Sequence, residues 1–289
     1  MNKKEKFIFE NERGQQIEFS IWSPLFLQNI DGISGLKNVI YSNKGMGQDG
    51  STYTGSNLDN RNIVVQGAIQ ESKEINREKL LSIINPKLQA KLIYDDGSKK
   101  KYVECIVETA PVITKENKPK FQISLLCPNP YWKDCNDSRV NIALWKGDFY
   151  FPLIIPQGKG IIMGHREPSL IVNVNNNGQV KTGMIIEFFA RGTVVNPSLF
   201  NVNTREFIKI NKTMSTGEKI IINTNDRHKK IESNLNGLTI NILNYIDLNG
   251  GGDTFLQLDV GDNLFRYNAD AKLDNLEVSI YFSSQYLGV

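Results

Sequence analysis

The sequence has little cysteine and little histidine, with three Cys and two His in 289 residues. Secreted disulfide scaffolds use more cysteines, in even number. The spacing of Cys127 and Cys135, with no second pair elsewhere, does not match a zinc site. We therefore expect Cys105, Cys127 and Cys135 to be small buried apolar residues, and we expect no metal and no cofactor.

Long hydrophobic runs and a strong excess of one charge are also missing. No apolar run approaches the roughly 20 residues of a membrane helix, and the start, MNKKEKFIFENERG, turns acidic before an apolar stretch develops, so we expect no signal peptide. The formal net charge is only +3, and bases are interleaved with acids. This pattern indicates no membrane partner and no basic face for specific nucleic-acid binding.

What the first half does contain is period-two alternation, which is typical of β structure with one buried face. Two strands are predicted around the turn at residues 11–14, and further strands over 62–70 and 120–127. Residues 90–110 predict a hairpin that turns at Asp96-Gly97, with one apolar face formed by Val103, Cys105 and Val107.

One helix is predicted among these strands, from Asn76 to Asn85. Ser72 or Asn76 can cap its start, and Pro86 ends it. Its apolar stripe consists of Leu80, Leu81, Ile83 and Ile84. One helix against strands predicts an α+β first domain that resembles a β-sandwich with one helix and a hairpin.

The second half predicts no helix. Asn177-Gly178 and Ser215-Thr216-Gly217 are expected to be the turns of two hairpins. Further strands are expected over 238–246, 254–260, 263–269 and 276–284. Many short strands predict a β-sandwich, so the fold class is mainly β.

The stretch LLCPNPYWKDC, residues 125–135, lies between the two patterns. Pro128 and Pro130 stop the preceding strand, and Tyr131 and Trp132 can pack the joint against one domain or both. The predicted domains are residues 1–133 and 134–289.

Patterns that could carry chemistry have simpler explanations. GMGQDG, residues 45–50, matches a dinucleotide fingerprint, but no helical stripe follows it, which favours a flexible loop. His165 and His228 have no nucleophile motif beside them. Carboxylates on the solvated side of a hairpin explain Glu104 and Glu108, with Asp95 and Asp96 at its turn. We expect no catalytic, cofactor-binding or metal-binding residues, and no enzyme.

The order of features resembles the distal tail protein family of siphophages, the siphovirus-type tail component. The likeness runs from about residue 8 to the last residue. It rests on RNIVVQGAI from Arg61, on NREKLLSIINP with AKLIYDDG, on CPNPYW, on FYFP at 149–152, on the long stretch from NNNGQVKTG to KIIINT, on LDVGDNLFRYNAD and on the ending IYFSSQYLGV.

The resemblance implies a ring-forming first domain and a galectin-like second domain. Six copies would form a ring at the tip of the tail tube, in the virion, after assembly in the host bacterial cytoplasm. Its partners would be the tail tube protein, the tail-tip hub or tail-associated lysin, and a receptor-binding protein, while the genome passes through without specific binding. The long loop over 42–60 is expected to contact the neighbouring subunit.

Two other functions are weighed against this scaffold. One is a carbohydrate-binding adhesion module, but the galectin constellation of His-Asn-Arg followed by Trp and Glu is missing, and Trp145 is the one tryptophan after residue 135. The other is a cell-wall hydrolase, but the sequence lacks the catalytic motifs that a hydrolase needs.

Overall fold

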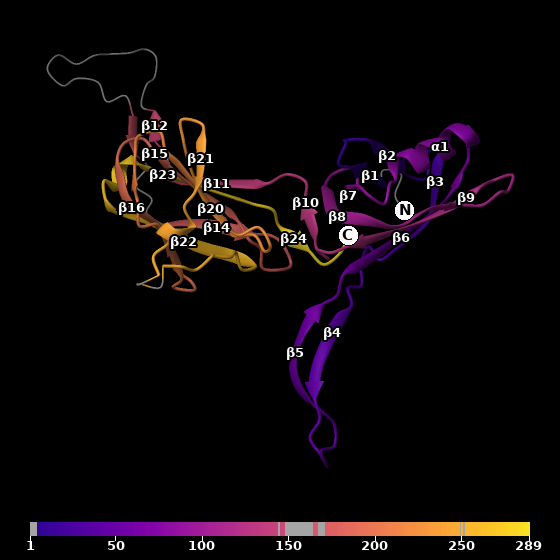
Figure 1. Cartoon of the computed structure of the whole chain (residues 1–289), viewed down its shortest axis with the longest axis horizontal. Coiled ribbons are helices and arrows are strands. Elements are labelled where there is room, and N and C mark those ends of the chain that lie inside the picture. Colours follow the sequence, from indigo (N-terminus) through magenta and orange to yellow (C-terminus); the bar gives the residue numbers. More distant parts are fainter. Residues whose placement is uncertain (1–4, 144, 148–163, 167–170, 249, 251) are drawn as a thin grey trace. The chain divides into compact units, whose positions relative to one another are not determined.

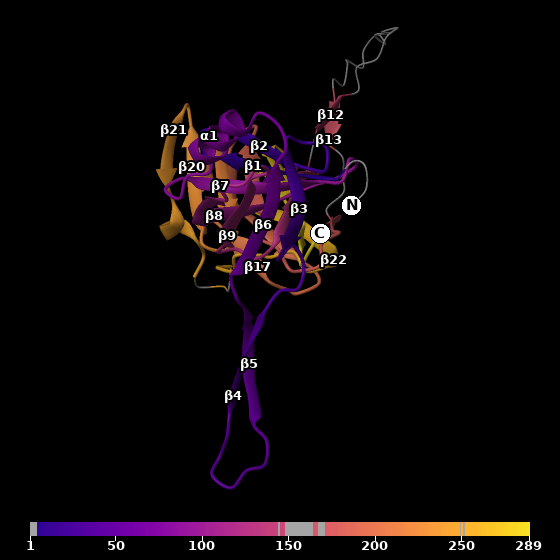
Figure 2. The same cartoon turned by 90° about the vertical axis from the view of Figure 1, so that its right-hand side faces the viewer.

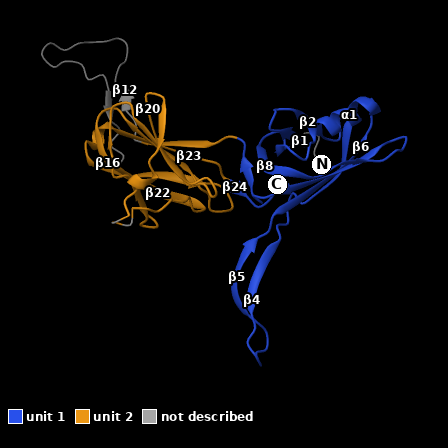
Figure 3. Ribbon diagram, viewed as in Figure 1, with its two compact units in different colours: residues 1–135, 285–289 blue, residues 136–284 orange. Residues whose placement is uncertain are grey.

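The chain crosses between two structural units twice. The computed structural model describes residues 5–143, 145–147, 164–166, 171–248, 250 and 252–289. The first unit holds residues 1–135 together with 285–289, and the second holds residues 136–284 (Figures 1 and 3). The first crossing lies close to the division expected after residue 133. The return of the C-terminal segment to the first unit is not foreseen by the sequence.

A nine-stranded antiparallel sheet forms the first unit. Along its main path the strands are ordered β2-β1-β7-β8-β9-β6-β3, and β10 pairs with both β8 and β24. An isolated bridge between Ser20 and Phe26 joins the two ends of the path, so the sheet curls around its core. The strands are β1 (Lys6–Asn11), β2 (Gln16–Phe19), β3 (Leu25–Asp31), β6 (Arg61–Ile69), β7 (Gln89–Asp95), β8 (Lys100–Ile113), β9 (Lys120–Cys127), β10 (Trp132–Asp134) and β24 (Gln285–Tyr286).

Period-two alternation predicts most of these strands correctly. The β1–β2 hairpin turns at residues 11–14, where Gly14 has a φ of 74°. The β7–β8 hairpin turns at Asp96-Gly97, and Val103, Cys105 and Val107 are all buried on one face. The strand expected over 120–127 is confirmed as β9. In the first unit, local alternation and turn residues therefore identify these strands, each of which has one face against the core.

The helix α1 (Lys73–Ile83) begins and ends earlier than predicted. Ser72 precedes it in the left-handed region with a φ of 43° and makes no capping hydrogen bond with its side chain. Asn76 lies inside the helix, and its amide donates to the Glu71 carbonyl over 2.6 Å. Leu80 and Ile83 are buried as expected, whereas Leu81 is exposed, so the stripe against the sheet is narrower than predicted.

Residues 42–60 do not form the loop that the sequence predicts. Strands β4 (Asn38–Asn43) and β5 (Thr52–Leu58) pair with each other in a separate two-stranded sheet. This hairpin, which we call the arm, extends away from the rest of the first unit in both views (Figures 1 and 2). Strand pairing without a buried face explains the difference, because such strands carry no apolar alternation.

The second unit is a β-sandwich, as predicted. One sheet has the order β11-β23-β15-β19-β20-β21, the other has the order β14-β22-β16-β17 with β18 on β16, and β12 pairs with β13. A single apolar core, which includes Phe188, Ile222, Phe265 and Ile280, draws on both main sheets. The elements are β11 (Ser138–Ala143), β12 (Trp145–Gly147), β13 (Gly164–Arg166), β14 (Ile171–Asn176), β15 (Ile185–Ala190), β16 (Val194–Asn201), β17 (Phe207–Lys209), β18 (Thr213–Met214), β19 (Lys219–Asn223), β20 (Lys230–Leu235), β21 (Leu238–Asn241), η1 (Leu243–Tyr245), β22 (Gly261–Ala271), η2 (Leu273–Asn275) and β23 (Leu276–Phe282).

The hairpin predicted around Asn177-Gly178 is wrong. Strand β14 pairs with β22, whereas β15 pairs with β19 and β23 in the other sheet. The buried Asn176 amide donates to the Val180 carbonyl over 3.0 Å, and its side-chain oxygen accepts the Gly178 N–H over 3.0 Å. These hydrogen bonds satisfy polar groups of the turn, in which the chain passes from one sheet to the other.

The hairpin predicted around residues 215–217 is wrong for the same reason. Strands β17 and β18 pair with β16, whereas β19 belongs to the opposite sheet. Buried Glu218 holds this corner by accepting hydrogen bonds from Lys212, Ser233 and the Ser215 N–H. Burial alone would raise the pKa of this carboxyl group, but the three donors outweigh burial and lower it. Residues 254–260 also form no regular strand. Among the described residues, their β-bridge is the one between Thr182 and Leu258, and the Gln257 amide donates to the Thr224 carbonyl over 2.8 Å.

The C-terminal segment is held to the first unit by Arg61. The guanidinium donates to the carbonyl oxygens of Gly32, Pro130 and Leu287 over 2.6, 2.7 and 2.6 Å. Arg61 is buried, and burial lowers the pKa of its guanidinium. We call this arrangement the Arg61 clasp. Next to it, the buried Trp132 ring lies 6.0 Å from the guanidinium carbon and donates its indole N–H to the Ile33 carbonyl.

The cysteines are not all buried as expected. Cys105 and Cys127 lie in the core of the first unit, whereas Cys135 is exposed. Desolvation raises the pKa of the Cys127 thiol to about 12 and raises that of Cys105 further. All three thiols are free.

Replacing Arg61 by Lys should destabilise the first unit. A lysine cannot donate to three separate carbonyls at once, so at least one buried acceptor loses its partner. We expect the free energy of unfolding to fall by about 3 kcal/mol. Urea denaturation followed by tryptophan fluorescence measures this, because Trp22 and Trp132 lie in the first unit. The matched control Arg77→Lys changes an exposed helix residue and should shift the value by less than about 0.5 kcal/mol. Equal effects of the two variants would contradict the role given to the clasp.

The native protein should expose one thiol to reagents. Thiolates are the reactive species, and the two core cysteines are both buried and held protonated. Titration with an aromatic disulfide reagent at pH 8 should count one reactive thiol in the native chain and three after unfolding. Cys135→Ser should abolish the native signal, and a remaining equivalent in that variant would show that the core cysteines are accessible.

Candidate functional site

The outward face of the β8 hairpin carries the carboxylates that the sequence singles out. Glu104 and Glu108 alternate with the buried Val103, Cys105 and Val107, so the predicted separation of faces is confirmed. Glu104 pairs with Lys133 over 3.2 Å. Glu108 accepts hydrogen bonds from the Asn62 amide and the Ser124 hydroxyl, each over 2.7 Å. Each carboxylate is thus engaged by neighbouring side chains on the sheet.

Asp95 and Asp96 hold the turn of the same hairpin. Asp95 is more buried than predicted; it accepts the Gly97 N–H over 2.9 Å and pairs with Lys100 over 3.2 Å. Asp96 is exposed and accepts the N–H groups of Lys99 and Ser98 and the Ser98 hydroxyl. These hydrogen bonds lower the pKa of Asp96 to about 2. Both groups act as acceptors within the turn.

The glycine-rich GMGQDG stretch lies at the tip of the arm, between β4 and β5. Gly47 and Gly50 have φ of 77° and 79°, which suits glycine. The Gly45 N–H is bonded to the Gln48 side chain over 3.0 Å. No helix follows, so the strand-turn-helix arrangement that binds a dinucleotide does not form here.

The two histidines both belong to the second unit. His228 lies exposed in a turn between β19 and β20. The backbone of His165 belongs to β13, and its side chain lies outside the described residues, as do the side chain of Trp145 and the FYFP segment. Among the residues that the structure describes, no cluster of three or more His, Cys, Asp or Glu could hold a metal ion.

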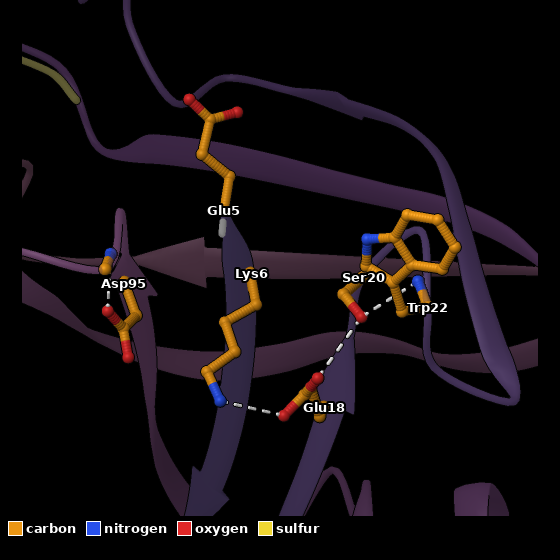
Figure 4. Close-up of a pocket in the computed structure, with 7 residues that line it drawn as sticks. Glu5, Lys6, Glu18, Ser20, Trp22 and Asp95 are labelled. Carbon is orange, nitrogen blue, oxygen red and sulfur yellow. Dashed lines mark hydrogen bonds and ion pairs between the residues drawn. The ribbon is translucent and has the colours of Figure 1, made fainter. Parts of the chain in front are cut away.

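A pocket of about 320 Å³ opens on the first unit beside β1 and β2 (Figure 4). Its lining combines an exposed aromatic ring, Trp22, with charged groups. Glu18 is engaged on both oxygens, by Lys6 over 3.1 Å and by the Ser20 hydroxyl over 3.2 Å, and Glu5 points away from it. The full lining is Glu5, Lys6, Glu18, Ser20, Trp22, Asp95 and Gly97. Because Glu18 and Asp95 are already paired, the pocket offers no free acid–base couple.

The arm carries the clearest binding signal in the first unit. Ile40, Tyr41, Met46 and Tyr53 are all exposed on it. Register places Ser42 opposite Tyr53 and Ile40 opposite Ser56, so Ile40 and Tyr53 share one face of the hairpin. Large apolar side chains on a projecting hairpin indicate a surface that a partner covers. In the sequence, the length of this segment indicated a binding role, and its apolar residues were not used.

The chain matches two models of phage tail proteins. Residues 12–127 match the phage tail protein RIFT-related domain, and residues 177–286 match the C-terminal domain of the siphovirus-type tail component. No curated protein matches the sequence. No helix in the described part of the chain is long and apolar enough to cross a membrane.

Two solved structures share the fold. The Dit protein of phage SPP1, described as a paradigm of the hub adsorption apparatus in phages that infect Gram-positive bacteria, superposes with a TM-score of 0.69 at 14% identity, over 97% of this chain and 99% of that one. A chain of the phage P2 baseplate in its activated conformation superposes with a TM-score of 0.50 at 10% identity, over 99% of both chains.

The two matched models follow one another in the order of the two units, and one fold spans nearly the whole chain. The expected family is thereby confirmed, and with it a structural role in the phage tail. The chain belongs to the siphophage distal tail protein family.

Proposed function

We propose that six copies of this chain form a ring through their first units, and that the arm is the contact that closes it. In a cyclic ring each subunit contacts its two neighbours through two different faces, and one face of each subunit binds the other face of the next. The arm supplies one such face, because among the described strands β4 and β5 pair only with each other and extend away from the nine-stranded sheet. This is the observation that carries the proposal.

The arm is not built to stand alone. An isolated two-stranded hairpin is marginally stable in water. Within the described part of the chain, no strand pairs with either outer edge of the arm, and large apolar side chains on it face solvent. Docking on a neighbouring subunit would cover Ile40 and Tyr53 and satisfy the strand edges.

The ring would join the tail tube protein on one side and the tail-tip hub or tail-associated lysin on the other, at the tail tip. The second unit would lie outside the ring and carry a receptor-binding protein. The small net charge of +3, with bases and acids interleaved, supports passage of the genome without specific binding. Assembly would take place in the host bacterial cytoplasm.

The same chain is proposed to have no catalytic activity. The support is local: Glu104, Glu108, Asp95 and Glu18 each make hydrogen bonds or ion pairs with neighbouring protein groups. A scaffold that works through repeated interfaces needs no reacting group.

Charging one face of the arm should weaken the ring. We expect the full-length double variant Ile40→Lys/Tyr53→Lys to remain folded, since both side chains are exposed, but to shift from hexamer toward monomer in native mass spectrometry. Burying two lysines against a neighbour is costly without partners. Val260→Lys places one lysine on an exposed apolar residue of the second unit and should leave the hexamer intact.

Full-length variants are needed because residues 285–289 complete the first unit. A fragment that ends near Trp132 would leave the Arg61 clasp without the Leu287 carbonyl. Hexamers that persist in the double variant at the concentration where the unmodified chain assembles would rule out the arm as the ring contact.

A further inference from the structure

Strand β21 forms one edge of the six-stranded sheet in the second unit, and β11 stands at the other. Strand β21 is last in the sheet order and pairs with β20 alone among the described strands (Figure 2). A two-residue turn, Asn236-Gly237, joins the two strands, with φ of 53° and 82°. Positive φ at both positions is the type I′ geometry of a tight hairpin.

The turn decides which backbone groups of β21 are free. In a two-residue hairpin, the flanking pair Leu235 and Leu238 exchanges both hydrogen bonds, and so does every second pair after it. Ile240 therefore bonds to Ser233, whereas Thr239 and Asn241 direct their N–H and C=O groups away from β20. These outward groups can be satisfied by an added strand.

The side chains of β21 extend the core face beyond the core. Every second residue here, Leu238, Ile240 and Ile242, lies on the same face as the buried Ile231 and Ser233 of β20. Exposure rises steadily along this row, from 3% at Ile242 to 54% at Ile240 and 65% at Leu238. The sheet thus extends beyond the apolar core that covers this face, and the side chains of Leu238 and Ile240 remain exposed to solvent.

The following segment adds to this apolar surface. Leu243, Tyr245 and Leu248 are exposed directly after β21. Edge strands are usually protected by charge, proline or a bulge. Residues 238–241, LTIN, contain no charged residue and no proline, and their register with β20 is regular. The edge is therefore open to pairing.

We propose that β21 binds an extended segment of another tail protein as an added strand, an inference that rests on the proposed place of the second unit outside the ring. The segment would bond to Thr239 and Asn241 and present an apolar residue at every second position over Leu238 and Ile240. A second copy of the chain is the less suitable occupant. Pairing of β21 with itself would be a two-fold contact, which cannot be part of a six-fold ring and would join two rings instead.

Amide hydrogen exchange in the assembled tail tests this for whatever protein supplies the segment. Purified tails and the purified chain are compared over residues 238–242. We expect the amides of Thr239 and Asn241 to exchange at least about tenfold more slowly in tails, which corresponds to about 1.4 kcal/mol of added protection. Equal rates in the two samples would overturn the inference. The same slowing in the concentrated chain alone, together with a doubled particle mass, would assign the edge to a second copy and overturn it as well.

Ile240→Lys supplies the second arm of the test, with Ile240→Val and Val260→Lys as controls. Thermal unfolding first establishes that all three fold, as expected for exposed positions. Tails built with Ile240→Lys should contain the chain in its normal amount and lose one other protein, whereas both controls should retain it. Loss of no protein would refute the inference while leaving the ring intact. Absence of the unmodified chain from tails would refute the proposed function instead.

Discussion

The first unit depends on one buried cation that holds three carbonyl oxygens. Arg61 begins β6, and its guanidinium joins the backbone at Gly32, Pro130 and Leu287. These positions are far apart in the sequence and belong to the end of β3, the proline-rich boundary and the C-terminal segment. A planar donor group with several N–H bonds in fixed directions suits three acceptors better than an ammonium does. The clasp makes the C-terminus part of a unit that the chain had left at Cys135.

Sequence patterns predicted where strands and turns lie, but they did not predict which strands pair when the partners are far apart in the sequence. Alternation with one buried face identified β1, β2, β7, β8 and β9. The Asn177-Gly178 pair is a strong hairpin signal, yet the chain changes sheets there because Asn176 bonds within the turn and β14 has a better partner in β22. The corner at Glu218 follows the same rule. A turn motif fixes the local bend and leaves the identity of the paired strand to the core.

The candidate surfaces were harder to predict because they lack the signal that burial leaves in a sequence. The arm has no face against its own unit, so its strands alternate neither in burial nor in hydrophobicity. Only the length and the glycine content of the arm stand out in the sequence. Strand β21 was expected within residues 238–246, but its exposure depends on how far the covering sheet extends, which no local pattern encodes. The expectation of no catalytic, cofactor-binding or metal-binding residues rested on missing motifs, and motifs can be read directly from a sequence.

The two units bring their apolar side chains to the surface in the same way. In each, an edge of β structure continues past the core and carries exposed apolar residues: Ile40 and Tyr53 on the arm, Leu238 and Ile240 on β21. An exposed, uncharged strand edge promotes association, and natural proteins usually protect such edges. The pocket beside Trp22 has the opposite character, because its charged groups already satisfy one another. The apolar strand edges at the described surface therefore suit added strands, whereas the pocket is lined mainly by charged groups.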